Sequence, residues 1–322
     1  MTRADDPMQD EYVRTLLSET VAAHVSPSAR VVQGEAHPLR ANMSGARMYR
    51  CDILLDTAVG SPKTVSLVIK EAELVERRAL AHLNQRGQPN VPYTHSLDLS
   101  TDEALWMAMQ YLEGQNRPSS LDPITEEALR AEAEALAAIH LASLGQGSEL
   151  AWLPRLEPRF FNEVVIGGWW RPHWERVLGN SRFVREFADE LSVVERAAES
   201  MPSEMVALVN EGTAATLVHL DINPSNVLVC QGKPYYIDWM TAHYGPFYVD
   251  LPHHHCTLEQ AEHYRVALRR YGVNISRVDF ADRYRVAAKY IALRYMWWTL
   301  ENWENDHSET AWVRHYMGLI KR

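Results

Sequence analysis

Residues 217–239 read LVHLDINPSNVLVCQGKPYYIDW, with a short apolar run on either side of Gly232. Two apolar runs around a glycine turn predict a β-hairpin. A hairpin symmetric about Gly232 places the Asn226 amide opposite the Asp238 carboxylate, and Asp221 lies in the loop just before the first strand. Such oxygen-bearing groups suit a hard cation such as Mg²⁺ with phosphate, plus a free carboxylate for a hydroxyl proton. The stretch therefore predicts a site that handles phosphate.

The chain before this stretch alternates between β-like and helical patterns. Apolar residues at helical spacing predict helices over 8–24 and 73–85. Short β-like runs predict strands over 29–32, 48–55, 65–70, 93–97 and 105–110. The turn-rich stretch EGQNRPSS, residues 113–120, then forms the candidate domain boundary.

The chain beyond this boundary is mainly helical. Helical spacing recurs over 129–144, 183–198, 260–271 and 280–317. The order of elements predicts an α+β fold in which residues 1–112 form a small β-rich N-lobe. A hinge is expected near 110–114, and residues 115–322 are expected to form a larger, mainly helical C-lobe that includes the hairpin.

A family resemblance rests on the motif H-x-D-x-x-x-x-N, from His219 to Asn226, and on the Ile-Asp pair that ends at Asp238. It resembles the catalytic and metal motifs of the eukaryotic-like small-molecule kinases, which include aminoglycoside phosphotransferases and choline kinases. Three other fragments resemble this family in the same order: SLVIK at 66–70, LAAIH at 136–140 and GPFYVDL at 245–251. The resemblance implies a protein kinase-like two-lobe fold. It also implies transfer of the γ-phosphate of ATP or GTP, with Mg²⁺, to a hydroxyl of a small molecule.

The resemblance implies roles for the residues around the hairpin. Asp221 would orient the acceptor hydroxyl or accept its proton, and Asn226 and Asp238 would hold Mg²⁺. His219 would brace the catalytic loop, and Asp250 would anchor this loop from below.

Further residues are implied for the nucleotide. Lys70 would pair with the α- and β-phosphates, steadied by a glutamate of the following helix. Glu76 fits the spacing E-x-x-x-L-x-x-L, and Glu73 is the alternative. Other expected contacts are Ser44 and Gly45 in the phosphate-covering loop 41–49, and Gln110 and Leu112 in the hinge. That loop has only one glycine, which gives some support to a pseudokinase-like binding module without turnover.

Two tryptophan clusters, at 169–174 and 297–312, bear on which acceptor the chain would bind. Core packing is one interpretation, and an aromatic wall for an organic cation is the other. The candidate acceptor residues are Trp297, Trp298, Glu301, Trp303 and Glu304. A net charge of −10 tolerates a cationic acceptor. The expected order is therefore an aminoglycoside-type antibiotic or similar hydroxylated amine first, which would imply antibiotic resistance. Choline, ethanolamine or another metabolite is the alternative.

Composition excludes several other classes. No basic stripe accompanies the net charge of −10, which argues against a nucleic-acid partner. No apolar run approaches the roughly 18 residues of a membrane span. The three cysteines form no C-x-x-C, and no secretory signal is visible, so we expect a cytoplasmic monomer or homodimer. Consecutive histidines at 253–255 point in different directions, which favours a loop end over a metal site. A protein kinase is disfavoured because no A-P-E segment follows Asp238.

Overall fold

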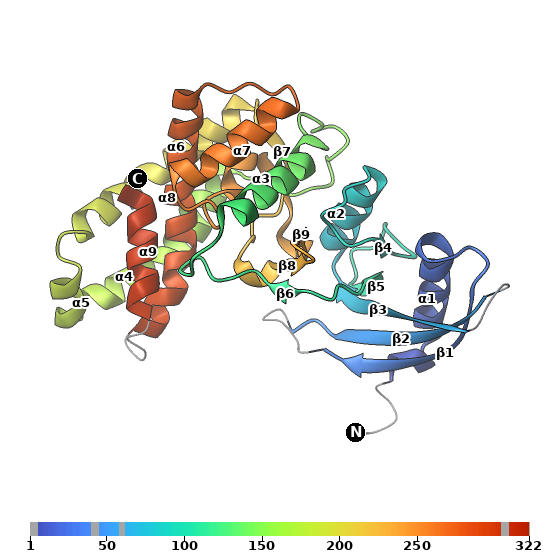
Figure 1. Ribbon diagram of the computed structural model, residues 1–322. Coiled ribbons are helices and arrows are strands. Elements are labelled where there is room, and N and C mark those ends of the chain that lie inside the picture. Colours follow the sequence, from blue (N-terminus) through green and yellow to red (C-terminus); the bar gives the residue numbers. More distant parts are fainter. Residues whose placement is uncertain (1–5, 40–44, 58–61, 304–308, 322) are drawn as a thin grey trace. The chain divides into compact units, whose positions relative to one another are not determined.

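Two compact units make up the chain of this computed structural model, which describes residues 6–39, 45–57, 62–303 and 309–321. The first unit comprises Met1–Gln115 and Leu228–Thr241, and the second comprises Asn116–Val227 and Ala242–Arg322. Figure 1 shows strands dominating the first unit and helices the second. The predicted α+β class is therefore confirmed.

A five-stranded antiparallel sheet forms the first unit, in the order β1-β2-β3-β5-β4. Its strands are β1 (Arg30–Pro38), β2 (Met48–Asp56), β3 (Lys63–Ala72), β4 (Thr94–His95) and β5 (Leu105–Gln110). All five match predicted strands, although β1 is longer and β4 shorter than expected.

Helix α1 (Glu11–His24) covers one face of this sheet. Its apolar stripe is fully buried and comprises Val13, Leu16, Leu17 and Val21. Each such side chain contributes about 1.5–3 kcal/mol by leaving water. Leu67 and Ile69 of β3 join the same core. Because strand side chains alternate, Val68 and Lys70 lie on the opposite face of β3. The next helix, α2 (Leu74–Gln85), begins immediately after this strand.

The predicted hairpin consists of β8 (Val227–Cys230) and β9 (Lys233–Tyr236). Gln231 and Gly232 both have positive φ, 52° and 77°, as a two-residue type I′ turn requires. The turn is therefore centred between these two residues, half a residue before the predicted centre at Gly232, so each predicted cross-strand partner is wrong by one residue. Asn90 fastens the hairpin within the first unit, because its carbonyl accepts from the Tyr236 amide at 2.9 Å and its side chain donates to the Pro234 carbonyl at 2.8 Å.

Helices dominate the second unit. They are α3 (Glu126–Leu141), the π-helix η3 (Phe160–Trp170), α4 (Arg171–Leu178), α5 (Ser181–Glu186), α6 (Leu191–Glu211), α7 (Leu258–Arg270), α8 (Arg277–Trp303) and α9 (Thr310–Lys321). Side-chain caps define the starts of two of these helices: Thr125 caps α3, and Thr257 forms a capping box with Gln260 at α7. The stretch 280–317, predicted as one helix, is divided between α8 and α9.

Two short antiparallel strands support the predicted catalytic loop in the second unit. β7 (Ala215–Val218) pairs with β10 (His243–Pro246), and the loop leads from β7 to the 3₁₀-helix η4 (Pro224–Asn226). The 3₁₀-helix η6 (Phe247–Asp250) follows β10 directly. Within the described parts of the chain, no helix is both long and apolar enough to cross a membrane.

Candidate functional site

Lys70 is held between two carboxylates in the first unit. Its Nζ atom lies 2.7 Å from Oε1 of Glu76 and 2.6 Å from Oδ1 of Asp238. Glu76 stands in the first turn of α2, and its side chain is buried with that of Lys70. Burial lowers the pKa of Lys70, but Glu76 and Asp238 outweigh this effect, so its pKa is raised. Lys70 therefore remains a cation. Of the two predicted glutamates, Glu76 contacts Lys70, whereas Glu73 is the N-cap residue of α2.

Asp238 adopts a left-handed backbone conformation, with φ of 64°. This conformation costs roughly 1–3 kcal/mol for a residue with a side chain, and such strain concentrates at functional sites. The Asp238 carboxylate meets the Lys70 ammonium from this backbone position.

A cavity of about 500 Å³ opens in the first unit, a volume within the usual range of small-molecule sites. Its lining comprises Thr64, Ser66, Gln110, Tyr111, Leu112, Glu113, Cys230, Gln231, Lys233 and Tyr235. The predicted hinge residues Gln110 and Leu112 therefore line one cavity with the hairpin. Gly114 follows the hinge, and a Cβ atom there would lie 2.4 Å from Cys230 Sγ and 2.9 Å from the Val229 carbonyl oxygen. Only glycine allows this close approach of the backbone.

The phosphate-covering loop lies only partly within the described residues. Gly45 has a φ of 72°, which suits glycine. The predicted contact Ser44 lies outside the described residues.

Asp221 accepts hydrogen bonds from three side chains of the second unit. Its Oδ1 accepts from the Tyr295 hydroxyl at 2.7 Å and from Asn223 Nδ2 at 3.2 Å, and its Oδ2 accepts from Asn226 Nδ2 at 3.1 Å. Burial raises the pKa of Asp221, but the Tyr295 hydroxyl and the charge of nearby groups, His219 and Arg294 among them, lower it below its usual value. The carboxylate is therefore kept ionised.

Asp250 fixes the backbone before Asp221. Its two oxygens accept from the amides of His219 at 2.7 Å and Leu220 at 2.8 Å. Leu220 has a left-handed φ of 64°, a conformation that these bonds hold in place. His140 contacts the same carboxylate at 3.2 Å, and Nδ1 of His219 accepts from the Asp221 amide at 3.3 Å. The loop thus rests on a buried polar support.

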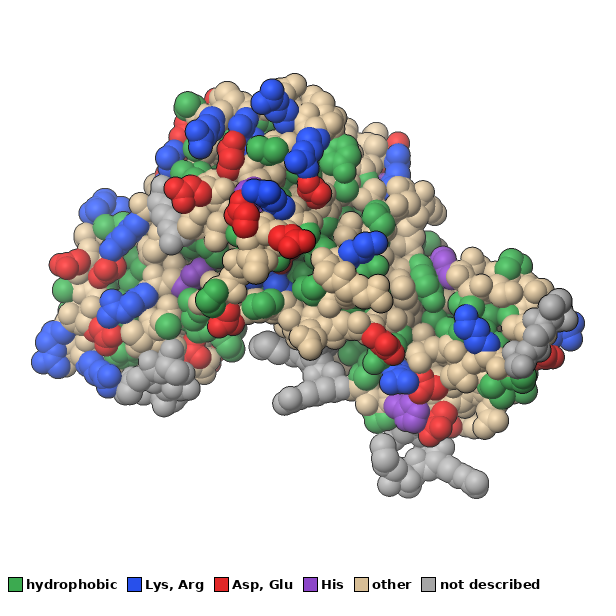
Figure 2. Space-filling model, viewed as in Figure 1, with side chains coloured by type: hydrophobic (Ala, Val, Ile, Leu, Met, Phe, Trp, Pro, Cys, Tyr) green, Lys and Arg blue, Asp and Glu red, His purple; other side chains and the backbone are tan. Residues whose placement is uncertain are grey.

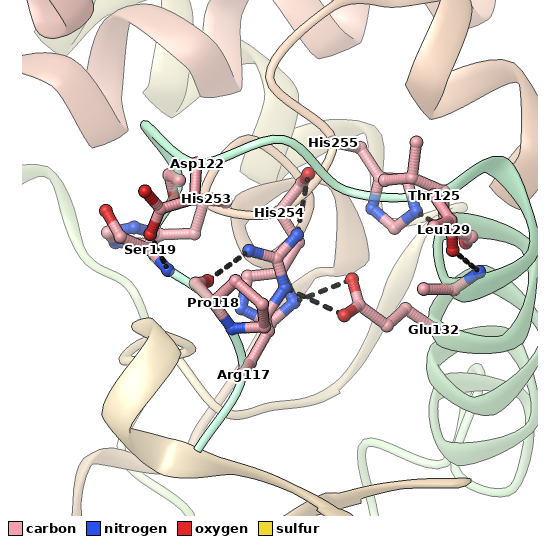
Figure 3. A network of polar contacts seen from close by, with 12 residues as sticks. Arg117, Pro118, Ser119, Asp122, Thr125, Leu129, Glu132, His253, His254 and His255 are labelled. Atoms are coloured by element: carbon pink, nitrogen blue, oxygen red, sulfur yellow. Dashed lines mark hydrogen bonds and ion pairs between the residues drawn. The ribbon is translucent and has the colours of Figure 1, made fainter. Parts of the chain in front are cut away.

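The histidines at 253–255 pack into a buried network (Figure 3). Nε of Arg117 lies 2.7 Å from Oε1 of Glu132, and Nδ1 of His254 lies 3.3 Å from Oε2 of the same carboxylate. The Ser120 hydroxyl donates to the His253 carbonyl at 2.7 Å. No group of three possible metal ligands occurs among the residues that the structure describes. The histidines belong to the loop after η6, and their contacts connect this loop to the segment that begins at Arg117.

The candidate acceptor residues lie in different surroundings. Trp303 is fully buried, with its ring 5.0 Å from that of Phe183 and its indole N–H donating to Thr310. This burial favours the packing interpretation for Trp303, and its place in an acceptor wall stays a prediction. Trp297 is half-buried beside His173, whereas Trp298 and Glu301 are exposed. Glu304 lies outside the described residues. The described candidates therefore differ from one another in burial.

Sequence reasoning missed Tyr295, which contacts Asp221, and its neighbour Arg294. Both lie in the run IALRYMWW, residues 291–298 of α8. The single charge in this apolar run was the available signal, because a buried charge requires a compensating environment.

On the face drawn in Figure 2, basic and acidic side chains are interspersed. The exclusion of nucleic acid nevertheless stays a prediction.

Comparison with known proteins supports the sequence-based resemblance. Residues 70–289 match the phosphotransferase enzyme family. No curated protein matches the chain in a sequence comparison.

Several solved structures share the fold. Spectinomycin phosphotransferase, in complex with ADP and spectinomycin, superposes with a TM-score of 0.55 at 12% identity, covering 95% of this chain and 93% of that one. A choline/ethanolamine kinase family protein from Mesorhizobium loti gives a TM-score of 0.53 at 18% identity, covering 98% and 94%. A thermostable mutant of an aminoglycoside phosphotransferase, with AMP-PNP and hygromycin B, gives 0.51 at 16% identity, covering 95% and 98%. The predicted kinase-like fold is thereby confirmed.

Proposed function

The chain belongs to the phosphotransferase enzyme family, and on this premise we propose that it transfers the γ-phosphate of ATP to a hydroxyl of a small molecule. The observation that carries this proposal is the Asp221 carboxylate, which is kept ionised by three donors on a loop fixed by Asp250. Such a carboxylate can orient an acceptor hydroxyl and take up its proton.

The first unit supplies the groups for the nucleotide in this proposal. The Lys70 ammonium, steadied by Glu76, binds phosphate oxygens. The cavity at Gln110 and Leu112 receives the base of ATP or GTP. The nucleotides ADP and AMP-PNP in the structural relatives support this assignment.

Mg²⁺ fits the oxygen donors of the two predicted ligands. Nδ2 of Asn226 donates to the carbonyl and to Oδ2 of Asp221, so the amide oxygen of Asn226 is the atom left for a cation. Asp238 offers a carboxylate. When bound, the metal would neutralise charge on the phosphate oxygens.

The acceptor order from the sequence puts hydroxylated amines of the aminoglycoside type first. Spectinomycin and hygromycin B in the structural relatives support this order. Choline or ethanolamine is the alternative, supported by the fold of the choline/ethanolamine kinase family protein. A pseudokinase-like nucleotide-binding module is a further alternative. Lys70, Glu76, Asp221, Asn226 and Asp238 are all present in the chain, which counts against it.

An ADP-release assay over hydroxyl acceptors tests the proposal. We expect Asp221→Asn to lower kcat by about 10²–10⁴-fold, because a general base is lost. Binding of a fluorescent ATP analogue should be unchanged. Asp282→Asn, an exposed acid on α8, is the matched control. Full activity of Asp221→Asn would contradict the role of this residue, and ATP hydrolysis abolished by Asp238→Ala would exclude the pseudokinase alternative.

A further inference from the structure

Arg294 is a buried cation surrounded by aromatic rings in the second unit. Its side chain lies in α8 and is 7% exposed. Its Cζ atom lies within 6 Å of four ring centroids, which we call the aromatic collar: Phe160 at 5.9 Å, Trp169 at 5.5 Å, Tyr290 at 5.8 Å and Tyr295 at 5.3 Å. Cation–π attraction compensates part of the loss of hydration.

The guanidinium has hydrogen-bond donors that no described residue of the chain uses. Nη1 donates to the Tyr290 hydroxyl at 2.6 Å. No carboxylate forms an ion pair with Arg294 among the residues that the structure describes. Five N–H groups are available on a guanidinium, and buried charges are normally paired. Arg294 is therefore attracted to the nearby Asp221 carboxylate without bonding to it, and its remaining donors are left for a second anion.

The groups around Arg294 connect it to the proposed base. Tyr295 follows it in the sequence, contacts its guanidinium by its ring and donates by its hydroxyl to Asp221. The ring of His253 lies 4.2 Å from that of Tyr295, and burial lowers the pKa of His253 to about 3, so this ring is neutral. Arg294 thus places a permanent positive charge near Asp221.

We propose that the free donors of Arg294 bind an anionic group, a carboxylate or a phosphate, of the acceptor whose hydroxyl meets Asp221. This inference rests on the proposed phosphotransfer, and it names an acceptor class other than the aminoglycoside type that the sequence placed first. The planar fork of an arginine matches a carboxylate or phosphate with two parallel hydrogen bonds. Tyr295 contacts both Asp221, which would meet the acceptor hydroxyl, and Arg294, which would bind the acceptor anion. It therefore links the two ends of the proposed acceptor site.

The same arrangement disfavours cationic acceptors. Aromatic faces of this kind can bind a quaternary ammonium, but here Arg294 occupies them. A second cation beside a buried guanidinium is repelled strongly, because the surroundings screen charge poorly. A hydroxy acid or a zwitterionic hydroxyamino acid is therefore favoured over choline, ethanolamine and the polycationic aminoglycosides that the sequence placed first.

Matched acceptor pairs test this selectivity. Homoserine is compared with 3-amino-1-propanol, which lacks its carboxylate, and glycerate is compared with glycerol. We expect the wild type to favour the carboxylate-bearing member by roughly 10–100-fold in kcat/KM, the worth of a charge-assisted hydrogen bond. Arg294→Met should abolish this preference with the KM for ATP unchanged, whereas Arg294→Lys should retain part of it.

A binding measurement covers the case in which no pair is turned over or Arg294→Met does not fold. Trp169 lies against Arg294, so glycerate or inorganic phosphate bound there should change its fluorescence in the wild type. The change should be lost in Trp169→Phe. A preference for the neutral or cationic member of a pair, or no fluorescence response to either anion, would overturn the inference and leave the phosphotransferase proposal standing. A different result would contradict the proposed function itself: full phosphotransferase activity of Asp221→Asn.

Discussion

The Nζ atom of Lys70 lies 2.7 Å from Oε1 of Glu76, six residues further along the chain. Both side chains are buried, so their attraction is weakly screened. We expect Glu76→Gln to lower kcat/KM for ATP by roughly 10–100-fold, because Lys70 loses the charge of Glu76, keeps its contact with Asp238 and is no longer held toward phosphate. Steady-state kinetics with varied ATP measure this change.

Glu73→Gln is the matched control for this variant. Glu73 is the N-cap residue of α2 but makes no side-chain capping bond. Its substitution should change kcat/KM by less than about twofold. A larger loss in Glu73→Gln than in Glu76→Gln would contradict the pairing seen here.

Tyr295→Phe removes one donor to Asp221 and keeps the ring. In the wild type the Tyr295 hydroxyl lowers the pKa of Asp221, so its loss should raise that pKa. The acidic limb of the kcat–pH profile should then move to higher pH, and kcat should fall by about tenfold. The exposed Tyr271→Phe serves as the control. An unchanged acidic limb in Tyr295→Phe would show that the hydroxyl does not act on the base.

The architecture was largely predictable because its elements have clear local patterns. Helical spacing over 8–24 and the apolar run 65–70 predicted the two elements that form the first core. The division of 280–317 was not predictable in the same way. Helix α8 is buried on several sides, and so its end at Trp303 leaves no change in amphipathic pattern. The register of the hairpin was missed because turn type, not glycine position alone, sets its centre.

The candidate site was predictable only where its residues lie in one linear motif. Asp221 and Asn226 stand five residues apart, so their spacing is visible in the sequence. Tyr295 lies 74 residues from Asp221, and no local rule connects the two. The collar around Arg294 likewise combines η3 with α8. Tertiary packing alone brings these groups together.

Glu132 couples stability to pH through the buried network around Arg117. Burial raises the pKa of Glu132, but His254 and Arg117 lower it to about 2, below its usual 4.5. A depressed carboxyl pKa contributes stability that is complete above pH 4.5 and is lost as pH falls toward 2. Urea unfolding at several pH values should therefore show a steeper acid loss in the wild type than in Glu132→Gln.

Glu132→Gln should also be destabilised at neutral pH by about 3–5 kcal/mol, because the buried Arg117 loses its charged partner. Glu126→Gln, at the exposed start of the same helix, is the control and should unfold like the wild type. Equal stability of Glu132→Gln and the wild type at neutral pH would mean that the network carries no net ion-pair energy.

Trp303 and Trp298 allow a comparison of two alanine variants, because both residues belong to α8 but differ in burial. Trp303 is fully buried against Phe183, whereas Trp298 is 42% exposed. Trp303→Ala should lower the free energy of unfolding by about 3–5 kcal/mol through the cavity it leaves. Trp298→Ala should change it by no more than about 0.5 kcal/mol. Chemical denaturation measures both, and acceptor KM is measured alongside. A folded Trp303→Ala with unchanged stability and a raised acceptor KM would restore Trp303 to the acceptor site and contradict its assignment to the core.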